Sequence, residues 1–384
     1  MRIVIVGAGP VGCFTARLLE QAGFHPILLE EHNEVGKPVQ CAGIVSTDII
    51  ALMRPFISDG AIINTINNFS INTPWQESFS INKDGVAAIL NREKFDTCLG
   101  EGLEIHLGET VTSIEQNTKG YLLRTAQGKE YETDILIGAD GVDSIVREYF
   151  LKRNNHKRES RNFELAYYYG LQYQIRLKDS KQQLSPDTVQ VFFDDTIPFF
   201  IWIVPENEYL LRLGVVADHG KKVLDEFIKE KGIEGKIEEV ITGKIPIGFI
   251  STSADGIALV GDAACQMKPL TGGGLSFGLR SAQILADCIN EGNLDRYDGR
   301  WKKQFGPEIR FGIRARKIYE NLEEYQRAEL FQIFKKNAPF IEQIVDFDTH
   351  SGLFREAFQK PSILLDAGKL LRPYLTDLAK EFFK

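Results

Sequence analysis

The sequence predicts an α/β fold in which a Rossmann-type nucleotide-binding domain carries an inserted antiparallel β-sheet domain and a helical C-terminal region. Three observations support this fold. A glycine-rich turn follows an apolar first strand, long alternating segments fill the middle of the chain, and apolar residues recur at helical spacing from Ser276 onward. At 384 residues the chain is too long for one simple core, so two lobes are expected.

The N-terminal segment has the pattern of a nucleotide-binding strand, turn and helix. Residues 3–6 are apolar and β-branched, as in a buried parallel strand, and they end directly in Gly7-Ala8-Gly9-Pro10-Val11-Gly12. Gly7 allows the tight turn, Gly9 lets the backbone approach a pyrophosphate, and Gly12 lets the helix pack closely on the strand. The helix N-terminus then presents free N–H groups to the phosphates.

Three further features complete this pattern. A second strand, residues 26–29, ends at Glu30, where a carboxylate is expected to accept hydrogen bonds from an adenosine ribose. Apolar strands also lead into Gly138-Ala139-Asp140-Gly141 and into Gly261-Asp262-Ala263-Ala264, and a glycine run follows at 272–274. Each segment alone is compatible with an ordinary turn. Together, and in this order, they indicate a domain that binds FAD, which restricts the chemistry to redox reactions.

The segments between these motifs are mostly strands. Residues 69–72 and 79–82 flank a Thr-Pro-Trp turn and predict a β-hairpin, and residues 103–137 alternate as strands. Residues 151–161 are polar and basic, so a surface connection is expected there. The second lobe is predicted from long strands and one helix, at 166–177, 189–193, 199–204, 209–216 and about 222–231.

These elements divide the chain into four expected parts. They are residues 1–160, the first part of the FAD-binding domain with a strand-rich insertion near 60–90; residues 161–250, a β-rich substrate domain; residues 251–290, the second part of the FAD-binding domain; and residues 291–384, a helical C-terminal region.

Composition excludes several classes of protein. The formal net charge of −8 argues against a nucleic-acid partner. No apolar run approaches the roughly 18 residues of a membrane span, and the first strand begins where a signal peptide would lie. The five cysteines are scattered without C-x-x-C spacing, so we expect reduced thiols in a cytoplasmic protein with no iron–sulfur cluster and no metal site.

Two of the segments resemble a known group of flavoproteins. Residues 138–147 and 260–264 are similar to signature segments of flavoprotein hydroxylases and of their relatives, the geranylgeranyl reductases. The resemblance implies FAD as the cofactor and implies that Asp262 bonds its ribityl chain. A carboxylate at a strand end suits that role, because it accepts hydrogen bonds from hydroxyl groups.

Other segments favour the reductase branch, and the resemblance spans about residues 1–320. Residues 36–43 look like its P-x-x-C motif, which places Cys41 by the flavin and substrate. Residues 200–205 look like its Y-x-W-x-F-P motif lining a prenyl cavity, and the glycine run at 269–275 also matches. The chain departs from both motifs. Phe200 stands where the family has Tyr, Val204 where it has a second aromatic residue, and Glu206 where it has Lys. After the cysteine, Ala42-Gly43-Ile44 stands where many members have Gly-Glu-Gly. These departures leave the particular prenyl substrate and the proton donor open.

The candidate site residues follow from the motifs and from residue chemistry. Cys41 is the candidate catalytic residue, because a compact thiol beside the flavin is able to donate a proton; the alternative is a small buried side chain. Arg92 is expected to contact FAD as a fixed cation, with a helix-cap or surface salt bridge as the alternative. The resemblance implies that Val111 meets the adenine edge. The expected cofactor-binding residues are Gly7, Gly9, Gly12, Glu30, Cys41, Ala42, Arg92, Val111, Asp140, Asp262, Gly273, Gly274 and Leu275, and the expected cavity residues are Phe200, Trp202 and Pro205.

The resemblance implies an FAD-dependent reductase that saturates double bonds of a geranylgeranyl or other polyprenyl chain, such as an archaeal-type membrane lipid precursor, by hydride transfer from reduced flavin. The flavin then supplies the difficult chemistry, and the protein supplies orientation and a dry cavity. The alternatives are a class A flavin monooxygenase or halogenase acting on an aromatic substrate, a quinone-linked flavoprotein dehydrogenase, and an isoprenoid-binding protein without turnover.

Partners and location are expectations of the same kind. The chain has no second G-x-G-x-x-G, so the electron donor is expected to dock transiently, as NAD(P)H or as a small redox protein such as ferredoxin. A lipid substrate implies peripheral contact with the inner membrane face, for which the basic residues of 152–161 are candidates; a solvated loop is the simpler alternative. Apolar residues at helical spacing in 363–382 are expected to pack on the body in preference to entering a membrane.

Overall fold

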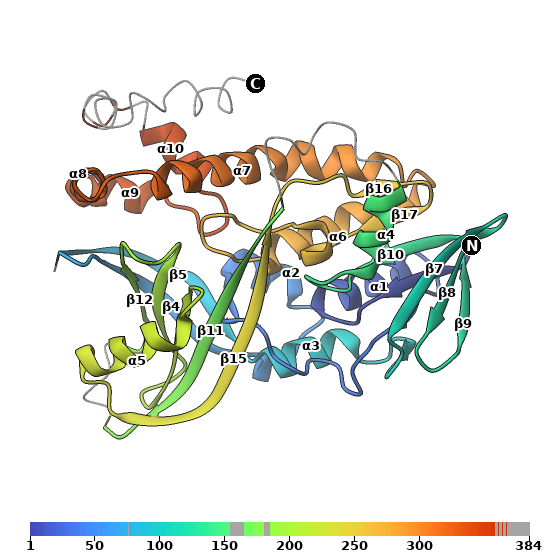
Figure 1. Ribbon diagram of the computed structural model, residues 1–384, viewed down its shortest axis with the longest axis horizontal. Helices are drawn as coiled ribbons and strands as arrows, with labels where there is room; N and C mark the ends of the chain where they lie inside the picture. The colour runs from blue at the N-terminus through green and yellow to red at the C-terminus, as the bar shows by residue number, and fades with distance from the viewer. Residues whose placement is uncertain are drawn as a thin grey trace.

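The structure is a computed structural model that describes residues 1–75, 77–153, 165–179 and 185–357 together with positions 360, 363 and 366. In this part of the chain the strands form three sheets, of six, eight and three strands (Figure 1). No helix among these residues is long and apolar enough to cross a membrane. The basic stretch 154–161, and the C-terminal stretch 364–382 apart from position 366, lie outside the described residues.

The six-stranded sheet carries the nucleotide-binding loops. Its strands are β1 (Ile3–Val6), β2 (Ile27–Leu29), β6 (Ile105–His106), β10 (Ile135–Gly138), β16 (Ser253–Ala254) and β17 (Ile257–Leu259). The order is β16-β17-β10-β1-β2-β6, and β1 pairs in parallel with β10 and β2 while β10 pairs in parallel with β17. The carboxyl ends of β1, β10 and β17 therefore lie side by side, and the three glycine-rich segments meet at one edge of the sheet.

Helices α1 (Pro10–Gln21) and α4 (Ile145–Arg153) contact strands of this sheet. Nearby helices are α2 (Thr47–Met53), α3 (Arg92–Gly100) and α6 (Leu275–Asn290). Helix α1 packs against α3 and α6 and buries Phe14 and Leu19 completely. Residues 151–153, expected to belong to a surface connection, instead form the last turn of α4, because Val146 and Phe150 lie one turn apart and are both buried.

The eight-stranded sheet unites two parts of the chain that the sequence suggested were separate. Its strands are β3 (Ile44–Ser46), β4 (Ile62–Asn72), β5 (Ser78–Leu90), β11 (Ala166–Leu177), β12 (Thr188–Phe193), β13 (Phe200–Pro205), β14 (Leu210–Val216) and β15 (Gly235–Ile247), in the order β15-β11-β14-β13-β12-β4-β5-β3. The predicted hairpin is present, since β4 and β5 pair antiparallel from Asn72 and Ser78. The pairing of β4 with β12 is parallel and joins the hairpin to the later strands.

The remaining elements lie at the two ends of the molecule. A meander of β7 (Val111–Asn117), β8 (Gly120–Thr125) and β9 (Glu130–Thr133) lies near the N-terminus, and α5 (Gly220–Lys231) packs on β14. The C-terminal helices are α7 (Arg296–Glu320), α8 (Glu324–Lys336), α9 (Ala338–Ile344) and α10 (Ser351–Ala357). Helices α8–α10 lie at the end of α7 above β4, β5 and β12, and α9 contacts β5 (Figure 1). The helical region therefore covers one end of the eight-stranded sheet.

Candidate functional site

A pocket of about 1140 Å³ lies where the two larger sheets meet. Its lining comes from the loops after β1, β2, β10 and β17, from the faces of β4, β5, β11–β13 and β15, and from α7–α9. Pockets for one small ligand are usually about 300–1,000 Å³. This pocket therefore has room for a cofactor together with part of a substrate.

All of the predicted site residues except Gly12 and Pro205 line this pocket. A Cβ atom at Gly12 would lie 2.1 Å from the Gly7 carbonyl oxygen, so this glycine permits close packing of helix on strand. The placement of Pro205 in the cavity was wrong. Side chains alternate along β13, so Phe200 and Trp202 share the cavity face while Pro205 points to the opposite face.

The first glycine turn leaves open space for a phosphate group. Gly7 has φ +99°, and a Cβ atom there would lie 2.4 Å from the Ala139 carbonyl oxygen, so only glycine fits. A Cβ atom at Gly9 would meet nothing within 4 Å, because this face borders the pocket. Helix α1 begins at Pro10 without a side-chain cap, and the N–H groups of its first turn need another acceptor. A pyrophosphate supplies one.

Glu30 connects the end of β2 to this turn. Its Oε2 accepts a hydrogen bond from the Ala8 N–H at 2.8 Å, and its Oε1 accepts one from the His32 N–H at 3.0 Å. The side chain is held at the pocket edge, where its remaining acceptor capacity is available to ribose hydroxyls. Val111 lies in the same part of the lining.

Asp140 shapes the second glycine-rich loop. One carboxylate oxygen accepts a hydrogen bond from Ser144 Oγ at 2.5 Å, and the other accepts one from the Val146 N–H at 3.2 Å at the start of α4. Arg147, in the same helix, is buried and donates to the Asp262 and Ala263 carbonyl oxygens at 3.3 Å each. Arg147 therefore joins the second loop to the third, a role that the sequence analysis missed although the residue closes the quoted motif.

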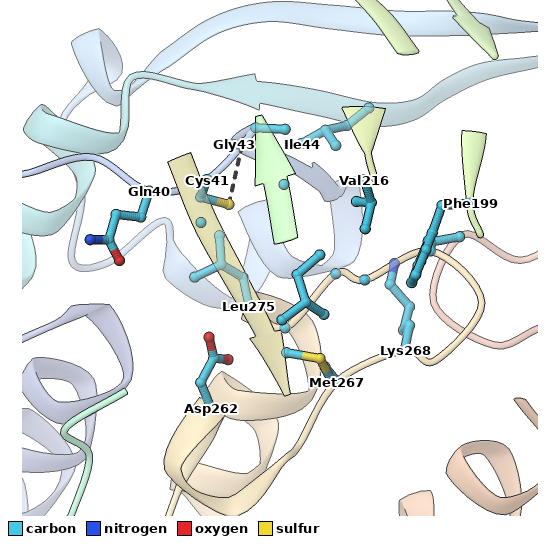
Figure 2. Close-up of a pocket in the computed structure, with 18 of the residues that line it drawn as sticks. Gln40, Cys41, Gly43, Ile44, Phe199, Val216, Asp262, Met267, Lys268 and Leu275 are labelled. Carbon is cyan, nitrogen blue, oxygen red and sulfur yellow. Dashed lines mark hydrogen bonds between the residues drawn. The ribbon is translucent and has the colours of Figure 1, made fainter. Parts of the chain in front are cut away.

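Asp262 extends from the third loop into the pocket with a carboxylate that accepts no hydrogen bond from any residue the structure describes (Figure 2). Burial raises its pKa above the ordinary value, and the positive charges of Arg92 and Arg147 oppose this shift. A Cβ atom at Gly274 would lie 2.7 Å from Asp262 Oδ1, so the glycine run leaves room beside the carboxylate. An unpartnered carboxylate next to open space fits the hydroxyl groups of a ribityl chain.

Cys41 and Arg92 meet on another side of the pocket. The Cys41 sulfur accepts a hydrogen bond from the Gly43 N–H at 3.3 Å (Figure 2). Arg92 makes a two-point contact with Asp96, with Nε–Oδ1 at 3.1 Å and Nη2–Oδ2 at 2.8 Å. Burial lowers the pKa of Arg92, but the negative charge of Asp96 and the neighbouring Cys41 sulfur outweigh it and raise the net pKa. Arg92 is therefore a permanent cation beside the sulfur. It is held by a largely buried salt bridge to Asp96, which lies one turn further along the same helix.

A buried ion pair holds the Cys41 loop in place. Arg212 of β14 and Glu206 have Nε and Oε1 2.6 Å apart, and both side chains are less than 10% exposed. The other arms of Arg212 donate to the Ala42 and Leu90 carbonyl oxygens. Glu206 was noted only as a departure from the family's lysine, and the structure shows that its charge is matched by Arg212.

Apolar side chains from distant segments form the remaining wall. Trp202 donates its Nε1–H to Gln172 Oε1 at 3.0 Å, which fixes the plane of the indole ring. Beyond it the lining is supplied by the hairpin, by α8 and α9 and by the segment that follows α9, none of which the sequence analysis connected with the cavity. These residues are Phe69, Ile71, Phe79, Ile81, Leu330, Phe331, Phe334, Ile341 and Phe347. The helical or alternating spacing of these residues is visible in the sequence. That they line one cavity depends on the tertiary fold.

The residues present fit FAD. Free amides at the start of α1 suit the pyrophosphate, Glu30 suits the ribose, and Asp262 with the glycines beside it suits the ribityl chain and the flavin edge. Residues 1–165 match the family model of an FAD binding domain. The cofactor of this protein is FAD, and its chemistry is that of an FAD-dependent oxidoreductase.

Similarity to known proteins extends over the whole chain. The chain is 29% identical over 406 residues to an uncharacterized protein of Methanocaldococcus jannaschii, covering 97% of this chain and 98% of that protein. It is 27% identical over 419 residues to the digeranylgeranylglycerophospholipid reductase of Methanosarcina acetivorans, covering 100% and 98%. The crystal structure of a geranylgeranyl bacteriochlorophyll reductase-like protein from Thermoplasma acidophilum has the same fold, with a TM-score of 0.77 at 20% identity over 96% and 98% of the two chains. The protein is therefore an FAD-dependent oxidoreductase that is similar over most of its length to geranylgeranyl reductases.

Proposed function

We propose that this protein saturates carbon–carbon double bonds in a geranylgeranyl-type chain of a membrane lipid precursor. The main support is the continuity of one pocket from the FAD-binding loops to an apolar wall of strands and helices. An isoprenoid chain buries apolar surface along such a wall, which contributes about 25 cal/mol for each Å² removed from water. The similar reductases of methanogenic archaea carry names that specify the same class of lipid.

Bound FAD supplies the two-electron chemistry, because reduced flavin is a hydride donor. The chain's own residues bind and orient the alkene. Phe200 and Trp202 present their rings to the cavity, and the hydrogen bond to Gln172 keeps the indole in one orientation. A wall of this kind excludes water and limits the positions available to an isoprene unit, which lowers the entropic part of the barrier. Cys41 and Asp262 mark the cofactor end of the pocket.

An anaerobic experiment tests the proposal. The FAD-loaded protein is reduced with dithionite, a geranylgeranyl-bearing phospholipid is added without oxygen, and the oxidised flavin band is followed while the lipid is analysed by mass spectrometry. The expected result is flavin reoxidation with a gain of two daltons for each double bond saturated. A reduced flavin that ignores the lipid but reacts rapidly with oxygen and hydroxylates an added aromatic compound would establish a monooxygenase instead.

We also propose that the electron donor docks transiently at this pocket, because the G-x-G-x-x-G turn is already assigned to FAD and the sequence has no second one. NADPH, NADH and reduced ferredoxin are compared for their rate of flavin reduction in the absence of lipid. Reduction by one donor, at a rate at least equal to that of turnover, identifies it. If none of the three reduces the flavin, the donor does not belong to this set.

A further inference from the structure

A buried lysine ammonium lines the pocket near its aromatic wall. Lys268 stands between the Asp262 turn and the glycine run, and its side chain is 5% exposed. Its Nζ donates a hydrogen bond to the Phe347 carbonyl oxygen at 2.9 Å and lies 3.3 Å from Asp348 Oδ1. An ammonium carries three N–H donors, and within the described residues the third has no oxygen or nitrogen partner.

This ammonium lies between the cofactor end of the pocket and the aromatic wall. A Cβ atom at Gly273 would lie 2.9 Å from Lys268 Cε, so the side chain passes directly beside the glycine run. On its other side Nζ lies 4.1 Å from the centre of the Phe347 ring, and Phe347 packs in the cluster that contains Phe200 and Trp202. Figure 2 shows the Lys268 side chain running beside Phe199, and Lys268 lines the same pocket as Cys41, Asp262 and Leu275.

We propose that Lys268 is the proton donor of alkene saturation, an assignment that rests on the proposed reductase function. One alkene carbon accepts hydride, with its electron pair, from reduced FAD. The other carbon accepts a proton from Lys268 Nζ, so the carbon–carbon π bond breaks, two C–H bonds form and one N–H bond breaks. The neutral amine then regains its proton from water, and the external donor returns two electrons to the cofactor, as one hydride from NAD(P)H or as single electrons from two reduced ferredoxins.

The surroundings of Lys268 suit a general acid. Burial lowers its pKa, and the negative charges of Asp348, Asp346 and Glu308 oppose this effect. An acid whose pKa lies below that of a free lysine transfers a proton more readily at neutral pH, while the carboxylates keep the ammonium populated. Asp348 is itself fixed, because it accepts a hydrogen bond from Ser46 Oγ at 2.6 Å.

Other proton-bearing groups in the lining are less suited to this step. The Cys41 sulfur accepts a hydrogen bond from the Gly43 N–H and lies beside Arg92, on another side of the pocket from the wall that holds Phe200 and Trp202. Burial raises the pKa of Tyr319 to about 12, which makes it a weak acid. The family's tyrosine is Phe200 in this chain, so that hydroxyl group is absent.

Two substitutions at Lys268 separate the proton from the charge. Lys268→Met removes both, and Lys268→Arg keeps a buried cation that does not lose its proton in proteins. We expect both variants to bind FAD and to bind the lipid, measured by flavin fluorescence titration and by lipid co-sedimentation, while the anaerobic reoxidation rate falls at least about 100-fold. Lys221→Met, which removes an exposed lysine on α5, is the matched control and should keep the rate.

A pH profile adds a readout that a structural role would not change. Alkene reduction requires protonated Lys268, so the rate falls as pH rises through the Lys268 pKa. Asp348 raises that pKa, so Asp348→Asn should move the falling limb of the profile to lower pH. The residual activity of Lys268→Arg should lack this limb.

The outcomes are distinct from those that test the reductase function. If the wild-type protein reoxidises on the lipid and Lys268→Arg matches its rate, Lys268 is not the donor. If Tyr319→Phe loses the rate while both Lys268 variants keep it, the proton comes from Tyr319. If the wild-type protein fails to reoxidise on any prenyl lipid, the proposed function fails, and the donor assignment fails with it.

Discussion

At the residue scale, Asp262 shows how a cofactor site reduces the stability of the empty protein. Burial raises its pKa above the ordinary 3.8, and no described residue donates a hydrogen bond to its carboxylate. A carboxyl group whose pKa is raised by folding stabilises the fold below its ordinary pKa, and that contribution is lost as pH rises through the raised value. At neutral pH the ionised carboxylate therefore destabilises the protein without FAD, and we expect hydrogen bonds from ribityl hydroxyls to reduce that destabilisation.

Asp262→Asn should change stability and cofactor affinity in opposite directions. The amide is neutral at every pH, so the FAD-free variant should melt at a higher temperature than the FAD-free wild type at pH 7, with the difference closing below pH 4. Loss of a charge-assisted hydrogen bond should weaken FAD binding about 10-fold or more. Calorimetry of the apoprotein and flavin fluorescence titration check the two effects. Unchanged FAD affinity would remove Asp262 from the cofactor site.

The expected role of Cys41 also belongs to the residue scale, because it depends on one sulfur atom beside Arg92. Cys41→Ala should keep FAD content, since the loop is held through the Ala42 carbonyl oxygen by Arg212, but it should reduce alkene reduction at least about 10-fold. Cys98→Ala is the matched control, because Cys98 does not line the pocket. Equal anaerobic rates for the two variants would exclude a catalytic role for Cys41.

At the element scale, the aromatic wall depends on a glycine in the neighbouring strand. A Cβ atom at Gly214 of β14 would lie 2.2 Å from the Trp202 ring, and Gly214 pairs directly with Trp202 across the sheet. Gly214→Ala should therefore displace the indole and break its contact with Gln172, at a cost of about 1–3 kcal/mol in the free energy of unfolding. A lower melting temperature with a red-shifted tryptophan emission checks this result. Gly299→Ala is the control, since a Cβ atom there meets nothing within 4 Å.

Elements that depend on a local sequence pattern could be predicted, whereas strand pairings between distant parts of the chain could not. The strand, turn and helix of residues 3–21 and the hairpin of β4 and β5 follow from glycine chemistry and alternation, and the structure confirms both. The parallel pairing of β4 with β12 joins residues more than a hundred positions apart, which no local pattern specifies. For the same reason Arg147, Arg212 and Lys268 were missed as site residues, because their partners lie on other elements.

At the scale of the whole molecule, the pocket exists because three parts of the chain meet around it. The nucleotide-binding sheet supplies the cofactor end, the eight-stranded sheet supplies one wall, and α7–α9 supply the other wall. Lys268 and Asp348 connect the third glycine-rich loop to the segment between α9 and α10. If the proposed substrate lies along these walls, cofactor binding and substrate binding depend on different elements and can be altered separately.

Filling the cavity from the helical side tests this division. Ala315 of α7 lines the pocket and packs in the apolar cluster that includes Leu330 of α8, and Ala315→Phe adds a ring to that wall. We expect FAD binding to stay unchanged, while kcat/KM for a geranylgeranyl lipid falls at least about 10-fold. The value of kcat/KM for a lipid with a shorter prenyl chain should fall less, because a shorter chain occupies less of the wall. Lys317→Ala, on the exposed face of the same helix, is the matched control. Equal losses for long and short chains would show that the isoprenoid does not extend along α7.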